Sequence, residues 1–182
     1  IIDHLTPHGA YDEGKRFSEA ILSTYADVYQ LDVKIARIFR TYGARMKIYD
    51  GNLLPDMINA ALDGKDIELG GPEDVRITLC NVSDIVDGMI KHMRSPVDVT
   101  VVNLGSDQEY FLSSIAEKVV HLTGASSRVR FDPAQHMVTE APLPDISKAR
   151  QVLHWLPLVR LDDGLKHMIA YARSRRQQSY AF

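Results

Sequence analysis

Near the start of the chain, the spacing of apolar residues changes from helical to strand-like. Between residues 11 and 30 they recur at intervals of three and four, at Phe17, Ala20, Ile21 and Val28, which predicts a helix. The side chains of residues 31–39 then alternate between two faces, a spacing of two that predicts a strand. One helix and one strand are too little for a domain, so we expect this pair to pack on further structure.

The rest of the chain keeps alternating between the two spacings. Further helices are predicted at about 53–63, 83–93, 113–123, 147–154 and 161–169, and strands at 67–69, 75–81, 97–104 and 128–131. Asn52, and either Asn81 or Ser83, are the expected helix caps. Residues 132–144 contain three prolines and no periodicity, which predicts a long loop. Alternating strands and helices indicate an α/β fold.

Composition narrows the class of protein. The 182 residues carry a net charge of −3, which disfavours a general nucleic-acid binder. No apolar run approaches the roughly 18 residues of a membrane span, and residues 1–4 lack the basic region of a signal peptide. We therefore expect a cytoplasmic chain without membrane contact. The locally basic Arg173–Arg176 segment is interpreted as a solvated end that complements a helix C-terminus.

The single cysteine and the histidines suggest no metal or redox chemistry. Cys80 lies in the apolar run Ile77–Cys80 and cannot form an internal disulfide, so we interpret it as a buried structural thiol rather than a nucleophile. No histidines have metal-ligand spacing, and no metal is predicted. Trp155, the only tryptophan, is predicted to lie in the core.

The most specific chemical feature is the pair Tyr11 and Lys15. Residues four apart share one face of a helix, so the two side chains can point into one pocket. A tyrosine that takes a proton at neutral pH must be stabilised as the phenolate, and a nearby ammonium favours that form. Such a pair also occurs by chance in many helices, where the tyrosine packs and the lysine is solvated.

Further segments accompany this pair in a fixed order. After Tyr11–Glu19 come Arg37–Met46, Arg76 ahead of Val82–Gly88, Val102–Gly105, Pro144–Ala149 and His154–Pro157. This order resembles the second half of UDP-glucuronate decarboxylases and dTDP-glucose 4,6-dehydratases, which are extended short-chain dehydrogenases/reductases. The resemblance covers nearly the whole chain.

The resemblance implies a fold and a division of the chain. Residues 1–50 would be the last part of a truncated dinucleotide-binding domain, the end of a Rossmann-type doubly wound sheet. Residues 51–182 would form a small mixed α/β domain that binds a nucleotide sugar, with some segments crossing back. NAD is the implied cofactor, a UDP- or dTDP-linked sugar the implied substrate, and a homodimer the implied assembly.

The resemblance also assigns roles to residues. Tyr11 would be the catalytic base, and Lys15 its partner that also binds the cofactor ribose. Tyr42 would lie at the cofactor, and Thr41 and Arg40 near the substrate. Arg76 would hold the pyrophosphate, because the guanidinium fork matches phosphate oxygens; the alternative is an exposed charge at a strand edge.

Three departures from the family pattern leave two hypotheses open. These 182 residues contain no glycine-rich phosphate loop. Arg40 and Ala44 stand where the family usually has asparagine and proline, and Pro142 and Leu143 occupy positions where it often has arginine. The chain is either part of an NAD-dependent nucleotide-sugar epimerase, dehydratase or decarboxylase that acts through a 4-keto intermediate, inactive by itself, or a non-catalytic module that binds nucleotide sugar or self-associates.

Overall fold

The computed structural model describes residues 7–47, 51–96, 100–133 and 143–179. The helices are α1 (Pro7–Tyr29), α2 (Leu53–Leu62), α3 (Val82–Met93), α4 (Leu112–Thr123), α5 (Ser147–Leu153) and α6 (Leu161–Ser179). The strands are β1 (Ile35–Ile38), β2 (Thr41–Tyr42), β3 (Ile67–Gly70), β4 (Arg76–Thr78), β5 (Cys80–Asn81), β6 (Val101–Leu104), β7 (Glu109–Phe111) and β8 (Val129–Asp132). The predicted α/β class is confirmed.

The strands pair two by two. β1 pairs with β6, β2 with β5 and β3 with β8, all parallel, whereas β4 and β7 are antiparallel. In the first pair, Ile35 lies opposite Val101 and Ile38 opposite Leu104. Parallel neighbours require a crossover connection, so strands far apart in sequence are brought side by side.

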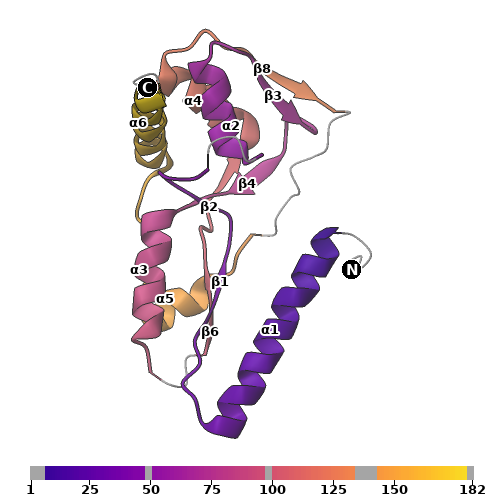
Figure 1. Ribbon diagram of the computed structural model, residues 1–182, viewed down its shortest axis with the longest axis vertical. Coiled ribbons are helices and arrows are strands. Elements are labelled where there is room, and N and C mark those ends of the chain that lie inside the picture. Colours follow the sequence, from indigo (N-terminus) through magenta and orange to yellow (C-terminus); the bar gives the residue numbers. More distant parts are fainter. Residues whose placement is uncertain (1–6, 48–50, 97–99, 134–142, 180–182) are drawn as a thin grey trace.

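One half of the molecule is built around the β1–β6 pair. Figure 1 shows α3 and α1 on opposite sides of this pair. The apolar core on the α3 side contains Leu104 and Trp155, both fully buried, and Ala36 of β1 packs against it. The indole Nε1 donates a hydrogen bond to the Asp84 carbonyl at 2.9 Å, which satisfies its buried polar atom. The prediction that Trp155 lies in the core is confirmed.

A second and larger core lies in the other half. It is formed by α2, α4 and α6 packed on the short strands, as the upper part of Figure 1 shows. The amphipathic spacing of these helices buries one stripe of each, for example Met57 and Ile58 of α2, Ile115 of α4 and Leu165 of α6. The polypeptide enters this half after β1 and leaves it to form α3 and β6. It returns for β7, α4 and β8, and leaves once more to form α5 before α6.

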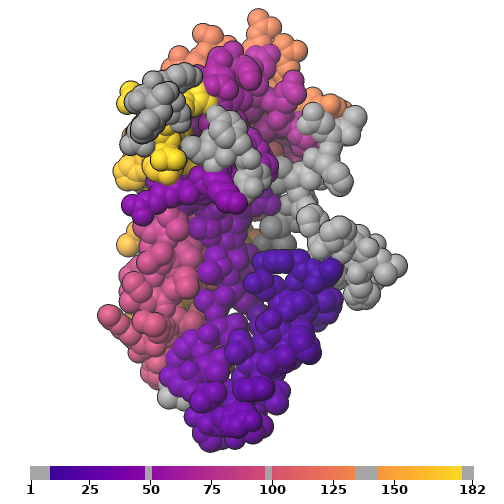
Figure 2. Space-filling model, in the orientation of Figure 1, coloured from indigo at the N-terminus to yellow at the C-terminus, as the bar shows by residue number. Residues whose placement is uncertain are grey.

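Helix α1 is exposed along its apolar stripe. Phe17 is 66% exposed and Val28 is 65% exposed, although their spacing is that of a buried helix face. Figure 2 shows α1 in indigo on the flank of the molecule. The expectation that this helix needs further structure to cover it agrees with these exposures.

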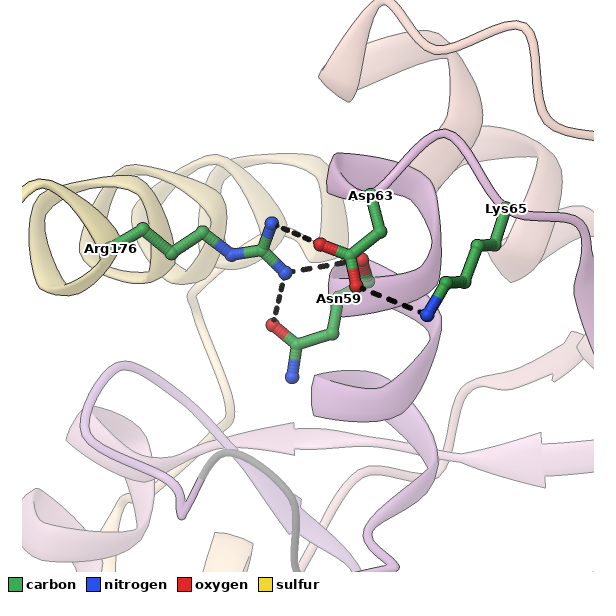
Figure 3. Close-up of polar contacts among 4 residues, drawn as sticks. All are labelled: Asn59, Asp63, Lys65 and Arg176. Carbon is green, nitrogen blue, oxygen red and sulfur yellow. Dashed lines mark hydrogen bonds and ion pairs between the residues drawn. The ribbon is translucent and has the colours of Figure 1, made fainter. Parts of the chain in front are cut away.

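The basic segment of α6 complements helix C-termini as expected, but Arg176 is largely shielded from solvent, which corrects the interpretation of the segment as a solvated end. Arg176 donates Nη1 to Asp63 Oδ1 at 2.6 Å and Nη2 to the Asn59 carbonyl at 3.2 Å, as Figure 3 shows. Arg173 donates to the Thr123 carbonyl at 2.9 Å. Both arginines therefore reach the C-terminal turns of neighbouring helices, α2 and α4. Cations at such positions typically contribute about 0.3–1 kcal/mol.

Several expected elements differ from those observed. The strand expected at 75–81 is two strands, because β4 pairs with β7 and β5 pairs with β2. The strand β7 was not expected, since its three residues carry no alternating pattern. The predicted strand at 97–104 is confirmed only over Val101–Leu104, and residues 97–99 lie outside the described residues. Most of the expected loop at 132–144 also lies outside them.

Both expected helix caps stand at the N-terminus of their helices, but only one of them makes a capping hydrogen bond. Asn52 precedes α2 but its side chain makes no capping hydrogen bond. Asn81, in contrast, caps α3, because its Oδ1 accepts hydrogen bonds from the Ser83 backbone nitrogen at 3.0 Å and its hydroxyl at 2.8 Å. Among the apolar residues of α3, Ile85 is buried, whereas Met93 is 66% exposed.

Candidate functional site

The predicted pair on α1 is brought together in the structure. The Lys15 ammonium lies 5.3 Å from the centre of the Tyr11 ring. Tyr11 is 65% exposed and Lys15 is also exposed, so a ligand can reach both side chains. A lysine this close to an aromatic ring makes a cation–π contact. The shared helix face follows from the four-residue spacing, whereas the catalytic role stays a prediction.

A second polar contact joins the same helix to β1. Arg37 donates Nε to Glu19 Oε1 at 2.8 Å and Nη2 to Glu19 Oε2 at 2.6 Å. The hydrogen bond from Arg37 lowers the pKa of the Glu19 carboxyl below its usual range, and the same bond raises the pKa of Arg37. Sequence reasoning assigned no role to either residue, although Glu19 lies one helical turn beyond Lys15.

The segment after β1 forms part of a separate cleft. Thr41, Tyr42 and Gly43 line a cleft of about 550 Å³ together with Arg45, Met46 and Val82. The Thr41 hydroxyl donates to the Phe39 carbonyl at 2.8 Å, which fixes its direction. Gly43 is required here, because a Cβ at this position would lie 2.4 Å from Val82 Cγ1.

Tyr42 and Arg40 differ in how much of each side chain a ligand can reach. Tyr42 is only 2% exposed, and burial raises the pKa of its hydroxyl to about 12. Its ring packs over Gly164 of α6, where a Cβ would lie 2.2 Å from the hydroxyl oxygen. Arg40 is half-buried, and loss of solvent lowers the pKa of its guanidinium. Because Tyr42 is almost completely buried and its hydroxyl is turned into the core, a ligand in the cleft can reach little of its side chain.

Arg76 projects from β4 onto the neighbouring strand. Its guanidinium lies 4.3 Å from the centre of the Phe111 ring, and Nη1 is 3.9 Å from Glu109 Oε2. The register of the antiparallel pair places Arg76 directly opposite Phe111. The side chain remains 54% exposed, so its charge is available to an anion. Sequence reasoning missed Phe111 and Glu109 because it did not predict β7.

A larger cleft of about 620 Å³ lies between α2 and β3. Apolar side chains such as Leu53 and Met57 line it together with the charged Asp56, Lys65 and Glu68. Apolar walls with a few convergent polar groups are typical of small-molecule sites. The sequence contains no signal for this cleft, since it arises from the packing of α2 against β3.

The predicted site residues therefore form separate groups. Tyr11 and Lys15 lie on α1, Arg40, Thr41 and Tyr42 follow β1, and Arg76 lies on β4. Which of them contact one ligand stays a prediction.

Three further observations concern the cysteine, metal ligands and membrane spans among the described residues. Cys80 is buried, and burial raises the pKa of its thiol to about 12, as expected for a structural cysteine. Residues 7–47, 51–96, 100–133 and 143–179 contain no group of three metal-ligating side chains. In that same part of the chain, no helix has the length and apolar character needed to cross a membrane.

Sequence comparison defines the family. The chain belongs to the NAD dependent epimerase/dehydratase family, whose model matches residues 2–105. It is 38% identical to UDP-glucuronic acid decarboxylase 3 of Arabidopsis thaliana, over 87% of this chain and 46% of that protein. It is 33% identical to UDP-glucuronic acid decarboxylase 1 of Danio rerio, over 93% of this chain and 40% of that protein. The chain thus spans about half the length of these relatives.

Solved structures share the fold. UDP-glucose 4-epimerase from Thermotoga maritima superposes with a TM-score of 0.84 and 23% identity, over 94% of this chain and 55% of that one. UDP-glucuronic acid 4-epimerase from Bacillus cereus, solved with NAD, superposes with a TM-score of 0.79 and 23% identity, over 97% of this chain and 54% of that one. At this identity the likeness establishes the fold, and the resemblance to nucleotide-sugar enzymes stated above is confirmed at the level of the family.

Proposed function

We propose that this chain is the nucleotide-sugar-binding part of an NAD-dependent enzyme that acts through a 4-keto sugar, most similar to a UDP-glucuronate decarboxylase. The observation that carries the proposal is the contact between Tyr11 and Lys15 inside the segment that matches the family. Residues 1–50 would complete a dinucleotide-binding domain, and residues 51–182 would bind the UDP- or dTDP-linked sugar, with α3, β6 and α5 crossing back to β1. The relatives that bind or act on UDP-sugars support this choice of substrate class.

Tyr11 and Lys15 fit the chemistry that such a reaction requires. NAD would supply a hydride acceptor for C4 of the sugar. The Tyr11 oxygen would accept the C4 hydroxyl proton, and the nearby Lys15 ammonium would favour the phenolate that does so. Both side chains are exposed on α1, so cofactor and sugar can reach them. Lys15 would also hold the cofactor ribose, and Tyr42 would lie near the cofactor.

Arg76 would bind the pyrophosphate, with Arg40 and Thr41 nearer the sugar. The Phe111 ring beneath the Arg76 guanidinium limits its motion and leaves its outer edge for phosphate oxygens. Glu109, at 3.9 Å, is too far for a strong hydrogen bond and would be displaced by a doubly charged phosphate. Removing this arginine should therefore weaken nucleotide binding without altering α1.

Calorimetric titration tests the proposal. UDP-glucuronate should bind the chain, and Arg76→Met should weaken its binding about 10–100-fold, the equivalent of losing a charged hydrogen-bonded contact. Arg94→Met is the matched control, because Arg94 is exposed at the end of α3. Equal affinities of wild type and Arg76→Met would contradict the assignment. NAD should give little heat with these 182 residues, since they contain no glycine-rich loop.

The alternative function, self-association, is favoured by the exposed stripe of α1. Its large apolar residues include Phe17, Tyr25 and Val28, each more than half exposed. Contiguous exposed apolar residues commonly mark an interface. We propose that a homodimer forms through this helix in a cytoplasmic protein. Sedimentation analysis of Phe17→Glu against wild type tests this: a dimer should dissociate in the variant, and an unchanged mass would contradict the proposal.

A further inference from the structure

Tyr11, Lys15 and Glu19 follow one another at steps of four residues along α1. Residues four apart lie on one face of a helix, so Lys15 has an aromatic ring one turn before it and a carboxylate one turn after it. Either neighbour can attract its ammonium, the ring through a cation–π contact and the carboxylate through an ion pair. The position of the ammonium thus depends on whether the Glu19 carboxylate is free to form an ion pair with it.

In the structure this competition favours the ring. The Lys15 ammonium lies 5.3 Å from the Tyr11 ring centre. Both carboxylate oxygens of Glu19 are held by Arg37, at 2.8 Å and 2.6 Å. This two-pronged geometry matches the guanidinium fork and is stronger than a single contact to an ammonium. No ion pair between Lys15 and Glu19 occurs among the described residues.

We propose that Arg37 is a positioning residue for the Tyr11–Lys15 pair, because it occupies the Glu19 carboxylate and so leaves the Lys15 ammonium at the Tyr11 ring. An exposed cation–π contact and an ion pair at this helical spacing are of similar strength. Release of Glu19 would therefore redistribute the ammonium between its two neighbours. The importance of this contact for catalysis rests on the proposed function, whereas the competition itself does not.

The arrangement on β1 makes this role specific to Arg37. Strand alternation turns Arg37 away from the core that Ala36 contacts, and toward α1. A simpler role for the same ion pair is to anchor α1 to β1. Removal of Arg37 alone disturbs both roles. Removal of Arg37 together with the Glu19 charge abolishes the anchor but also removes the competitor for Lys15.

The test is NMR of the chain with 13C-labelled lysine, in which the Tyr11 ring shifts the signals of the Lys15 methylene next to the ammonium. Tyr11→Leu assigns that shift. Arg37→Gln should reduce it by roughly half, as expected for two neighbours of similar strength. The double variant Glu19→Gln/Arg37→Gln should restore the wild-type shift. Arg37→Lys, which retains a cation for Glu19, should fall between wild type and Arg37→Gln.

The control and the opposing outcomes are defined by the same spectra. Arg16→Gln removes another arginine of α1, one that lies 3.6 Å from Glu13, and should leave the Lys15 shift unchanged. Failure of the double variant to restore the shift would assign Arg37 to anchoring alone, and absence of the shift in wild type would refute the contact. UDP-glucuronate titration of Arg76 variants remains interpretable in either case, so failure of this inference is distinguishable from failure of the proposed function.

Discussion

Replacing Gly88 with alanine adds one methyl group where α3 packs against two fully buried side chains. The new Cβ would lie 2.9 Å from Leu104 Cδ2 and 2.9 Å from Trp155 Nε1, both closer than side chains tolerate. Leu104 and Trp155 are fully buried, so neither can move into solvent. The indole is further held by its 2.9 Å hydrogen bond to the Asp84 carbonyl.

The change that Gly88→Ala causes in the free energy of unfolding is the sum of opposing contributions. Alanine is favoured over glycine inside a helix by about 1 kcal/mol. Overpacking a core by one methyl group costs about 1–3 kcal/mol, and weakening the indole hydrogen bond costs about 1 kcal/mol more. We expect Gly88→Ala to lower the free energy of unfolding by about 1–3 kcal/mol, which lowers Tm by roughly 2–12 °C for a chain of this size.

Urea unfolding followed by Trp155 fluorescence measures this change directly, since Trp155 is the only tryptophan. Gly14→Ala is the matched control, because a Cβ at Gly14 of α1 would meet nothing within 4 Å. The control should be as stable as wild type or more stable. If Gly88→Ala also keeps the wild-type midpoint, the close packing of α3 on Trp155 is incorrect.

Two further predictions concern polar groups. Arg176→Met should lower the free energy of unfolding by about 1–2 kcal/mol, because the hydrogen bonds of Arg176 to Asp63 and Asn59 are partly shielded from solvent. Lys65→Met removes an exposed 3.8 Å contact to the same Asp63 and should change the free energy of unfolding by less than about 0.5 kcal/mol. Similar losses in both variants, measured by urea unfolding, would argue against the structural role of Arg176. His92 is 2% exposed, and burial lowers the pKa of its imidazole. The unfolded chain therefore binds a proton at His92 more readily than the folded chain does. The free energy of unfolding should decrease as the pH falls below about 6.5, by at most ~1.4 kcal/mol per pH unit. His92→Gln should flatten this dependence between about pH 7 and pH 5, and an unchanged slope in the variant would contradict the reasoning.

The exposed apolar stripe of α1 shows that a local sequence pattern predicts a helix but does not predict its burial. The spacing of Phe17, Ile21 and Val28 predicts the helix correctly, because helical periodicity is a local property. Burial depends instead on what packs against the helix, and in this structure the stripe remains exposed. The same holds for Met93 of α3. The sequence pattern therefore identified apolar faces without specifying which of them this structure covers.

The short strands illustrate a second limit. The apolar run at 75–81 reads as one strand, yet its two parts pair with different partners, β4 with β7 and β5 with β2. The partner strands lie elsewhere in the sequence, and no local signal encodes their register. Hence Phe111 and Glu109, which flank Arg76, could not be found from the sequence.

By itself the sequence determined the α/β class, the helix that carries Tyr11 and Lys15, and the family, because periodicity, helical spacing and motif order are written along the chain. Only the tertiary structure decided that Arg37 holds Glu19, that Tyr42 turns its hydroxyl into the core, and that Arg176 reaches the end of α2. These contacts join residues that are distant in sequence, and their formation depends on how separate elements pack.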